Sequence, residues 1–242
     1  MVSFVFVEYP FREAEPITWQ GEQTALPTSG NLQTLPSQQD TIPAEQAVTC
    51  FTPGTLVTTI KGKRPVEALR PGELLLTRDC GFQPLLWRGL RHRLPARATA
   101  QADFPVIIRA GALGHGQPER DMIVSPGHKV LSTDRELLRS LGETEALVEA
   151  RTLEGLPGIS RATSPAATYV HLLLDNHEII LTENTWTESF QLSRSTAERL
   201  ARAGVDEMRP FLGGLDGTSH HIIQPPARQC LQVTELPLSK TA

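Results

Sequence analysis

Cysteine is scarce in this chain of 242 residues, which contains three. Cys50, Cys80 and Cys230 lie far apart, are odd in number and never form a Cys-x-x-Cys pair. A disulfide framework needs an even set of cysteines, and a structural zinc site needs closely spaced ligands. We therefore expect neither, and we predict that Cys80 and Cys230 are small, buried apolar side chains without chemistry.

Long hydrophobic runs and blocks of like charge are also missing. The formal net charge is -4, with a pI near 6.0, so we expect no nucleic-acid partner. The apolar stretch Met1–Val7 is short, has no basic residue before it and meets an acid at Glu8. This pattern favours a strand over a cleavable signal peptide or a membrane-spanning helix. It leaves the compartment open, either cytoplasmic or exported by a non-classical route.

The composition divides the chain into three parts. Residues 1–47 are predicted to be an N-terminal strand and a disordered tether, because Gln, Pro, Thr, Ser and Gly dominate from residue 14 onward. Residues 48–192 form the predicted domain. Residues 193–242 are predicted to be a C-terminal extension of helix and loops.

Short apolar runs separated by Pro and Gly fill the central part. Runs of this length, rich in Val, Ile and Leu, are typical of β-strands, so we predict a mainly β fold. The predicted strands span residues 55–60, 73–77, 83–88, 104–109, 122–125, 130–132, 169–174 and 178–182.

Two segments favour helix instead. Within residues 134–153, one or two helical turns are expected, the second of them at Thr144–Leu147. A further short helix is predicted from Ser195, with Ser195 as its N-cap, Glu198 at the third helical position and Gly204 beyond its end.

Cys50 is the candidate nucleophile. It follows Thr49 directly, so a thiolate there can attack the Thr49 carbonyl and convert the amide into a thioester. This reaction needs groups that hold the amide and protonate its nitrogen. The segment Ser125-Pro126-Gly127-His128 offers a hydroxyl and an imidazole on one tight turn between two predicted strands.

Three blocks of the chain occur in a recognisable order over residues 48–192. They are Cys50–Thr77, Ser125–His128 and Tyr169–Ile180, followed by the ending Trp186-Thr187-Glu188-Ser189. Together they resemble the Hint superfamily, the autoprocessing domains of hedgehog proteins and inteins. The ending is similar to that of bacterial Hint domains of the alphaproteobacterial type.

The resemblance implies a horseshoe of short twisted strands with pseudo-two-fold symmetry and few short helices. A weak internal echo, Val66-Glu67-Ala68 and Val148-Glu149-Ala150, agrees with two related halves. The resemblance also implies roles for the site residues. The matching positions are Cys50 as nucleophile of an N-to-S acyl shift, Ser125 as contact to the scissile amide, His128 as proton donor to the leaving nitrogen and His177 as the late-block histidine.

Two departures from the resemblance narrow the expected reaction. Inteins cyclise an Asn near their end, but the corresponding place here holds Glu188, whose carboxylate lacks the required nitrogen. Hedgehog domains activate a sterol with an Asp, where this chain has Leu85–Arg88. We therefore predict an acyl shift at Thr49–Cys50 and N-terminal self-cleavage, without full splicing or sterol transfer.

The predicted reaction needs few partners. Its substrate is the chain's own N-terminal segment, and its acyl acceptor is water or an external nucleophile. We expect no cofactor and a monomeric chain. We also expect no metal site, since His220-His221 has no third ligand nearby in the sequence.

Other interpretations stay open. A Hint fold that has lost turnover could act as a binding or structural module. A thiol hydrolase is disfavoured, because Pro53 and Gly54 prevent a helix directly after Cys50. Individually, Ser125 also suits a turn cap, His128 a hydrogen-bonded turn residue and His177 a hairpin loop without chemistry. Glu188-Ser189 also suits a structural pair at the end of the domain.

Overall fold

The computed structural model describes residues 49–93, 101–139, 142–164, 167–202, 208–212 and 223–231. The predicted strand and tether of residues 1–47 lie outside this part of the chain, as do many residues of the predicted 193–242 extension.

The largest sheet contains nine of the described strands, and it joins pairs of consecutive strands to strands that are far apart in sequence. Its order is β14-β9-β8-β13-β12-β1-β3-β4, with β2 paired to β1. The members are β1 (Leu56–Thr59), β2 (Gly62–Pro65), β3 (Leu74–Leu76), β4 (Phe82–Pro84), β8 (Lys129–Ser132), β9 (Ala146–Glu149), β12 (Ile179–Thr182), β13 (Thr185–Glu188) and β14 (Cys230–Leu231).

Two smaller sheets complete the β structure. One has the order β10-β6-β7, and in the other β11 pairs with β5. Their bounds are β5 (Trp87–Arg93), β6 (Val106–Ile108), β7 (Met122–Val124), β10 (Ile159–Arg161) and β11 (Ala167–Leu173). The prediction of a mainly β fold is confirmed, whereas the horseshoe shape and the pseudo-two-fold symmetry stay predictions.

The single strand predicted over residues 83–88 is wrong, because the chain changes sheets there. β4 ends at Pro84 and β5 begins at Trp87. Between them, the Leu85 amide donates to the Glu73 carbonyl, and the Leu86 amide donates to the Leu173 carbonyl on β11. A continuous apolar run therefore hides a crossing from one sheet to another, which periodicity cannot reveal.

The helices are short. They are α1 (Arg135–Leu138), α2 (Arg194–Arg202) and α3 (Arg209–Leu212), with 3-10 turns η1 (Val66–Ala68), η2 (Gln101–Asp103) and η3 (Ala150–Leu153). No helix in the described ranges has the length and apolarity that crossing a membrane requires.

Two details of the helix predictions need correction. The helical turn expected at Thr144–Leu147 is absent, and Ala146 begins β9, whose first three residues are buried against the core and whose residues pair with β8. The helix expected from Ser195 begins at Arg194, and the hydroxyl of Ser193 accepts the Thr196 amide at 3.2 Å, so Ser193 is the cap. Sheet pairing overrides local helix propensity in the first case.

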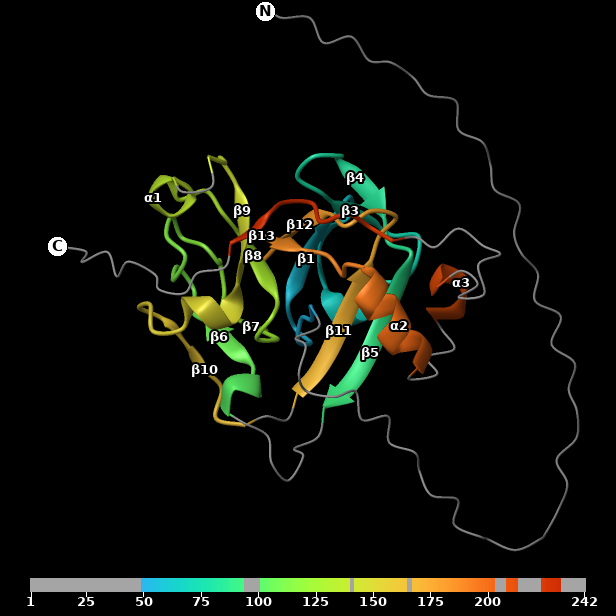
Figure 1. Ribbon diagram of the computed structural model, residues 1–242, viewed down its shortest axis with the longest axis horizontal. Helices are drawn as coiled ribbons and strands as arrows, with labels where there is room; N and C mark the ends of the chain where they lie inside the picture. Colours follow the sequence, from blue (N-terminus) through green and yellow to red (C-terminus); the bar gives the residue numbers. More distant parts are fainter. Residues whose placement is uncertain are drawn as a thin grey trace, which may run out of the picture. The chain divides into compact units, whose positions relative to one another are not determined.

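β11 lies between two apolar clusters. Val170 and Leu172 point into the larger cluster, and Leu173 belongs to the smaller one. The smaller cluster also contains Trp87 of β5 and Leu200 of α2, so α2 covers the β5–β11 pair (Figure 1). Burial on both faces explains why consecutive residues of this strand, from Tyr169 to Leu173, are all buried instead of alternating between core and solvent.

The residues around Cys50 are tied to two of these strands. Phe51 forms antiparallel bridges to Val124 at the end of β7 and to Val170 on β11. Its amide donates to the Val170 carbonyl at 2.9 Å, and the Val170 amide donates back at 2.8 Å. Because Phe51 is only 1% exposed, the start of the domain is inserted into the core.

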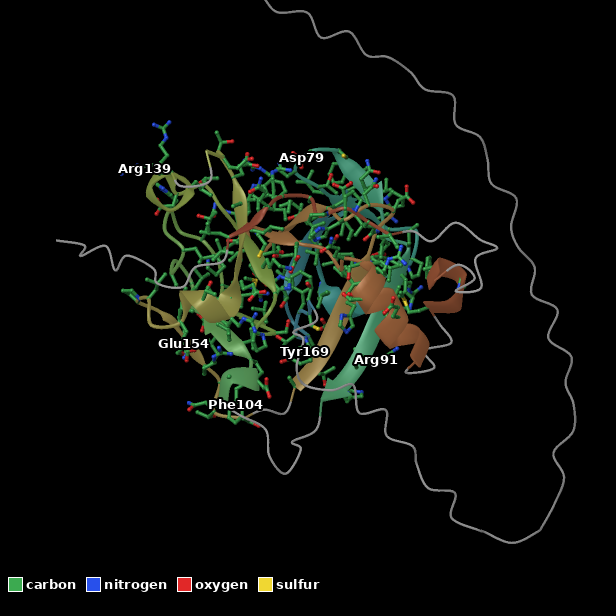
Figure 2. The ribbon with its side chains drawn as sticks, in the orientation of Figure 1. Asp79, Arg91, Phe104, Arg139, Glu154 and Tyr169 are labelled. Atoms are coloured by element: carbon green, nitrogen blue, oxygen red, sulfur yellow. The ribbon has the colours of Figure 1, made fainter. Side chains whose placement is uncertain are left out.

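The described part of the C-terminal extension packs back on the domain. Cys230 and Leu231 pair in parallel with β9. The prediction that Cys80 and Cys230 are buried is wrong, because both side chains are exposed. Arg228 forms ion pairs with Glu145 and with Asp79, one of the labelled side chains in Figure 2. These contacts lock residues 227–231 against the end of the largest sheet.

Gln224 is the polar anchor of this segment. Its side-chain nitrogen donates to the carbonyls of Leu174 at 2.8 Å and Asp175 at 3.0 Å, and its side-chain oxygen accepts the Leu192 amide at 3.0 Å. With 3% of its surface exposed, Gln224 thus satisfies three main-chain groups that water cannot readily reach.

Replacing Gln224 by Ala should lower the free energy of unfolding by about 3 kcal/mol, because buried main-chain groups lose their partners. Urea unfolding at pH 7 measures this change. The matched control is Gln229→Ala in the same segment, where the side chain is exposed and the expected loss is below about 0.5 kcal/mol. Equal losses in both variants would contradict an anchoring role for Gln224.

Candidate functional site

The peptide bond between Thr49 and Cys50 is the centre of the site. Thr49 is 7% exposed and Cys50 is 3% exposed, so the bond is held inside the protein. The turn that follows is closed at Gly54, whose φ of 91° suits glycine and whose amide donates to Glu67. The chain therefore enters the core at Thr49 and leaves it at the turn.

Ser125 contacts the nitrogen side of this peptide bond. Its Oγ accepts the Cys50 amide at 3.1 Å, and its own amide donates to the Cys50 carbonyl at 3.1 Å. Ser125 follows β7, beside the bridge between Phe51 and Val124. The structure thus brings the predicted serine to the predicted amide.

His171 contacts the carbonyl side. Its Nδ1 lies 2.9 Å from the Thr49 oxygen, and since a carbonyl only accepts, Nδ1–H is the donor. The Cys50 Sγ lies 3.5 Å from Nδ1 and 3.7 Å from Nε2 of the same ring. With the proton on Nδ1, Nε2 is the ring atom that can accept the thiol hydrogen.

Aromatic side chains hold the His171 ring in place. Trp87 stacks on it with centroids 6.2 Å apart and planes 14° apart, and Phe190 meets its edge at 5.2 Å. Opposite His171 in the sheet lies Gly89, where a Cβ would come within 2.0 Å of the Trp87 ring. Glycine at this position therefore makes room for the Trp87 ring that supports the histidine.

His171 lies within the third block, Tyr169–Ile180, but the resemblance assigned the histidine role of that block to His177. The available signal was a lone histidine in a strand whose neighbours, Val170 and Leu172, are fully buried hydrophobics. In Figure 2 the labelled Tyr169 precedes it on β11, opposite Arg91 on β5. Sequence alone could not show which face of β11 turns toward Cys50.

His177 lies away from the peptide bond in its interactions. Its Nδ1 accepts the Ala227 amide at 3.0 Å, so its Nε2–H donates to Glu188 at 3.1 Å. Both ring nitrogens are thereby used by the C-terminal segment and by a carboxylate. The structure does not bring His177 into hydrogen-bond contact with Cys50 in the described part of the chain.

His128 ends the turn that positions Ser125. Its amide donates to the Ser125 carbonyl at 3.0 Å, and its ring packs edge-on against Phe51 with centroids 4.4 Å apart. The ring is fully buried, and within the described residues neither of its nitrogens has a hydrogen-bond partner. The link between His128 and the Cys50 amide is therefore indirect: the His128 amide bonds the Ser125 carbonyl, and Ser125 Oγ bonds the Cys50 amide.

Burial keeps the imidazoles of His171 and His128 uncharged at neutral pH. It lowers the pKa of His171 to about 4, although the hydrogen bond to Thr49 opposes the shift. It also lowers the pKa of His128 to about 4, where Glu188 opposes the shift and Lys129 adds to it. Both imidazoles are therefore neutral at pH 7.

Glu188, which the sequence analysis left without a role, is completely buried beside Thr49. Thr49 Oγ1 donates to Glu188 Oε1 at 2.6 Å, and Lys129 Nζ lies 2.9 Å from Oε2. Burial by itself raises the pKa of Glu188, but the His177 hydrogen bond and the Lys129 charge outweigh it and hold the pKa below its ordinary value. Glu188 is therefore ionised at neutral pH.

Ser189, next to Glu188, has a structural contact. The Ser189 hydroxyl accepts the Glu178 amide at 2.9 Å, so Glu188 and Ser189 serve different partners. No group of three or more His, Cys, Asp or Glu side chains within the described residues is arranged to hold a metal ion. On one peptide bond, the arrangement therefore combines the Cys50 thiol, a hydrogen-bond donor to the carbonyl from His171 and a hydrogen-bond acceptor for the amide from Ser125.

The neutral histidines predict a pH-dependent stability. In the unfolded chain each binds a proton near its ordinary pKa of 6.5, whereas the folded chain resists protonation until about pH 4. The free energy of unfolding should therefore fall as the pH drops from 6.5 to 4, by about 3 kcal/mol for each histidine.

Urea unfolding of the Cys50→Ala chain across this range measures the loss. His128→Leu in the same background should remove about half of it, since one of the two imidazoles whose pKa is lowered is gone. An unchanged slope in that variant would contradict a neutral, buried His128.

Comparisons with known proteins give one family match and several similar solved structures. A family model described as the Hint domain matches residues 49–194. The crystal structure of the gp41-1 intein has a TM-score of 0.36 and 11% identity, covering 57% of this chain and 97% of the intein. The solution structure of a bacterial intein-like domain from Clostridium thermocellum has a TM-score of 0.38 and 12% identity, covering 58% of this chain and 97% of that domain.

A comparison with curated proteins gives no significant match. The alphaproteobacterial type stays a prediction. The family model covers more than half of the 242 residues and begins at the peptide bond that His171 and Ser125 hold. This chain therefore belongs to the Hint domain family.

Proposed function

We propose that this domain cleaves its own chain at Thr49–Cys50 through an N-to-S acyl shift. One observation carries the proposal: a single buried peptide bond has a thiol beside it, a donor on its oxygen and an acceptor on its nitrogen. A structural cysteine would need none of these contacts. The product is a thioester, which water or an external nucleophile then opens to release residues 1–49.

His171 would serve two steps with its two nitrogens. Nδ1–H donates to the Thr49 oxygen and stabilises the negative charge that develops there. Nε2 accepts the thiol proton, and the resulting thiolate attacks the Thr49 carbonyl carbon. Neutral imidazole is the form that this requires, which fits a pKa of about 4.

Departure of the Cys50 nitrogen completes the shift. The new carbon–sulfur bond forms as the carbon–nitrogen bond breaks. The thiol loses one proton and the nitrogen gains one, and return of the proton held by His171 restores the group that supplied the nitrogen, so every side chain except Cys50 ends as it began. Ser125 Oγ is already hydrogen-bonded to this nitrogen. We assign proton delivery to Ser125 and His128 acting together, because His128 forms the turn that holds Ser125 and both of its ring nitrogens remain unused in the described structure.

We expect no second half of splicing in this domain. Glu188 supplies a carboxylate that cannot cyclise, and its oxygens already bind Thr49, Lys129 and His177. His177 likewise has both nitrogens engaged. Hydrolysis or capture of the thioester is the remaining outcome.

The direct test is fragment formation. The full chain, incubated with hydroxylamine or dithiothreitol, should give residues 1–49 and 50–242 by mass spectrometry, because both reagents open thioesters. Cys50→Ala should stay intact, and Cys80→Ala, which changes an exposed cysteine, should cleave normally. A wild-type chain that stays intact would overturn the proposal in favour of a binding or structural module.

A second test separates His171 from other histidines. His171→Ala should slow fragment formation by about 10²- to 10³-fold, since the carbonyl loses its donor and the thiol its base. His92→Ala, an exposed histidine on the adjacent strand β5, is the matched control and should keep the wild-type rate. Equal rates for the two variants would remove His171 from the mechanism.

A further inference from the structure

The residue before the cleaved bond has a built site for its side chain. Thr49 is 7% exposed, and its hydroxyl donates to Glu188 Oε1 at 2.6 Å. Its carbonyl meanwhile accepts from His171 on the other side. A residue in a passive tether would have no need of a buried, charge-assisted hydrogen bond.

The partner of this hydroxyl is a fixed anion. Glu188 is completely buried, and its charge is balanced by Lys129 Nζ at 2.9 and 3.0 Å from its two oxygens. The Lys129 amide donates at 3.0 Å and His177 Nε2 at 3.1 Å. An ionised carboxylate only accepts hydrogen bonds, so a polar group placed against Oε1, beside the Lys129 amide and Nζ, has to be a donor.

The C-terminal segment completes this site. The Ala227 amide donates to His177 Nδ1, which leaves the proton on Nε2 and aims it at Glu188. Gln224 and β14 hold the segment that carries Ala227. The site therefore depends on parts of the chain on both sides of β13, whose last residue is Glu188.

Few side chains satisfy these conditions. Valine has the shape of threonine but no donor, and alanine leaves both the donor and a methyl-sized space missing. Aspartate or glutamate would place a second negative charge beside Glu188. Serine retains the donor, so serine and threonine share the β-hydroxyl group that Glu188 binds.

We propose that Glu188, held by Lys129 and His177, is a specificity-determining and positioning group that selects a β-hydroxyl residue directly before Cys50. This inference rests on the proposed function and names its substrate class: leader segments that end in Thr or Ser. Binding the hydroxyl fixes the side chain of residue 49 while His171 fixes its carbonyl. Together the two contacts orient the carbonyl carbon toward Sγ.

The test is a series at position 49 in the full chain. Thr49→Ser should form fragments at nearly the wild-type rate, and Thr49→Val should be about ten- to a hundredfold slower, because a hydrogen bond to a charged group is lost. Equal rates for Val and Thr would overturn the proposal. A serine chain as slow as the valine chain would overturn it as well, since the site would then read shape.

A readout without chemistry separates this inference from the proposed function. In the unreactive Cys50→Ala chain, Thr49→Val should lower the melting temperature by about 5 °C relative to Thr49→Ser. If the wild-type chain never cleaves, the proposed function fails, and the hydroxyl site still stands or falls on this comparison. Equal melting temperatures for Ser and Val would overturn the site itself.

A double-mutant comparison ties the effect to Glu188. In a Glu188→Gln chain, the rate difference between Thr49 and Thr49→Val should shrink several-fold, because the charged acceptor is gone. An undiminished difference would contradict recognition by Glu188. The position 49 series keeps its meaning even if Glu188→Gln fails to fold, since it leaves Glu188, Lys129 and His177 unchanged.

Discussion

The paired main-chain hydrogen bonds between Phe51 and Val170 are the constraint on which the site depends. They draw the beginning of the domain between β7 and β11, far from its neighbours in sequence. Phe51 then packs in the core, and Thr49 and Cys50 are buried with it. Without this insertion the thiol would lie on a surface loop, where no group could hold the carbonyl and the amide at once.

Polar groups that are buried with the peptide bond need hydrogen-bond partners inside the protein. Most of the buried polar side chains around the bond have such partners, but the ring of His128 does not within the described structure. His171 and Ser125 each have a partner on the bond, and Glu188 is matched by Lys129 and His177. His128 has a buried ring whose nitrogens have no partner in the described structure. An unsatisfied buried polar group destabilises a fold, and such conflicts are expected at functional sites.

The predicted strands were mostly correct because short apolar runs bounded by Pro and Gly are a local signal. The failures occurred where tertiary contacts decide. The chain changes sheets at Leu85 and Leu86, and Ala146 joins a sheet despite helix-favouring neighbours. The predicted contact between Ser125 and the amide of Cys50 is present, since it follows from a turn next to a strand that pairs with Phe51.

The sequence by itself determined the candidate nucleophile, the turn that presents Ser125, the mainly β fold and the family, because these depend on residues close together in the chain. Only the tertiary structure shows that His171, and not His177, contacts the Thr49–Cys50 peptide bond. Only the tertiary structure brings Glu188 to Thr49, 139 positions away in the chain. Which face of β11 meets Cys50, and which carboxylate meets a buried hydroxyl, depend on how distant strands pair. A linear pattern carries the period of a strand but not the identity of its neighbour.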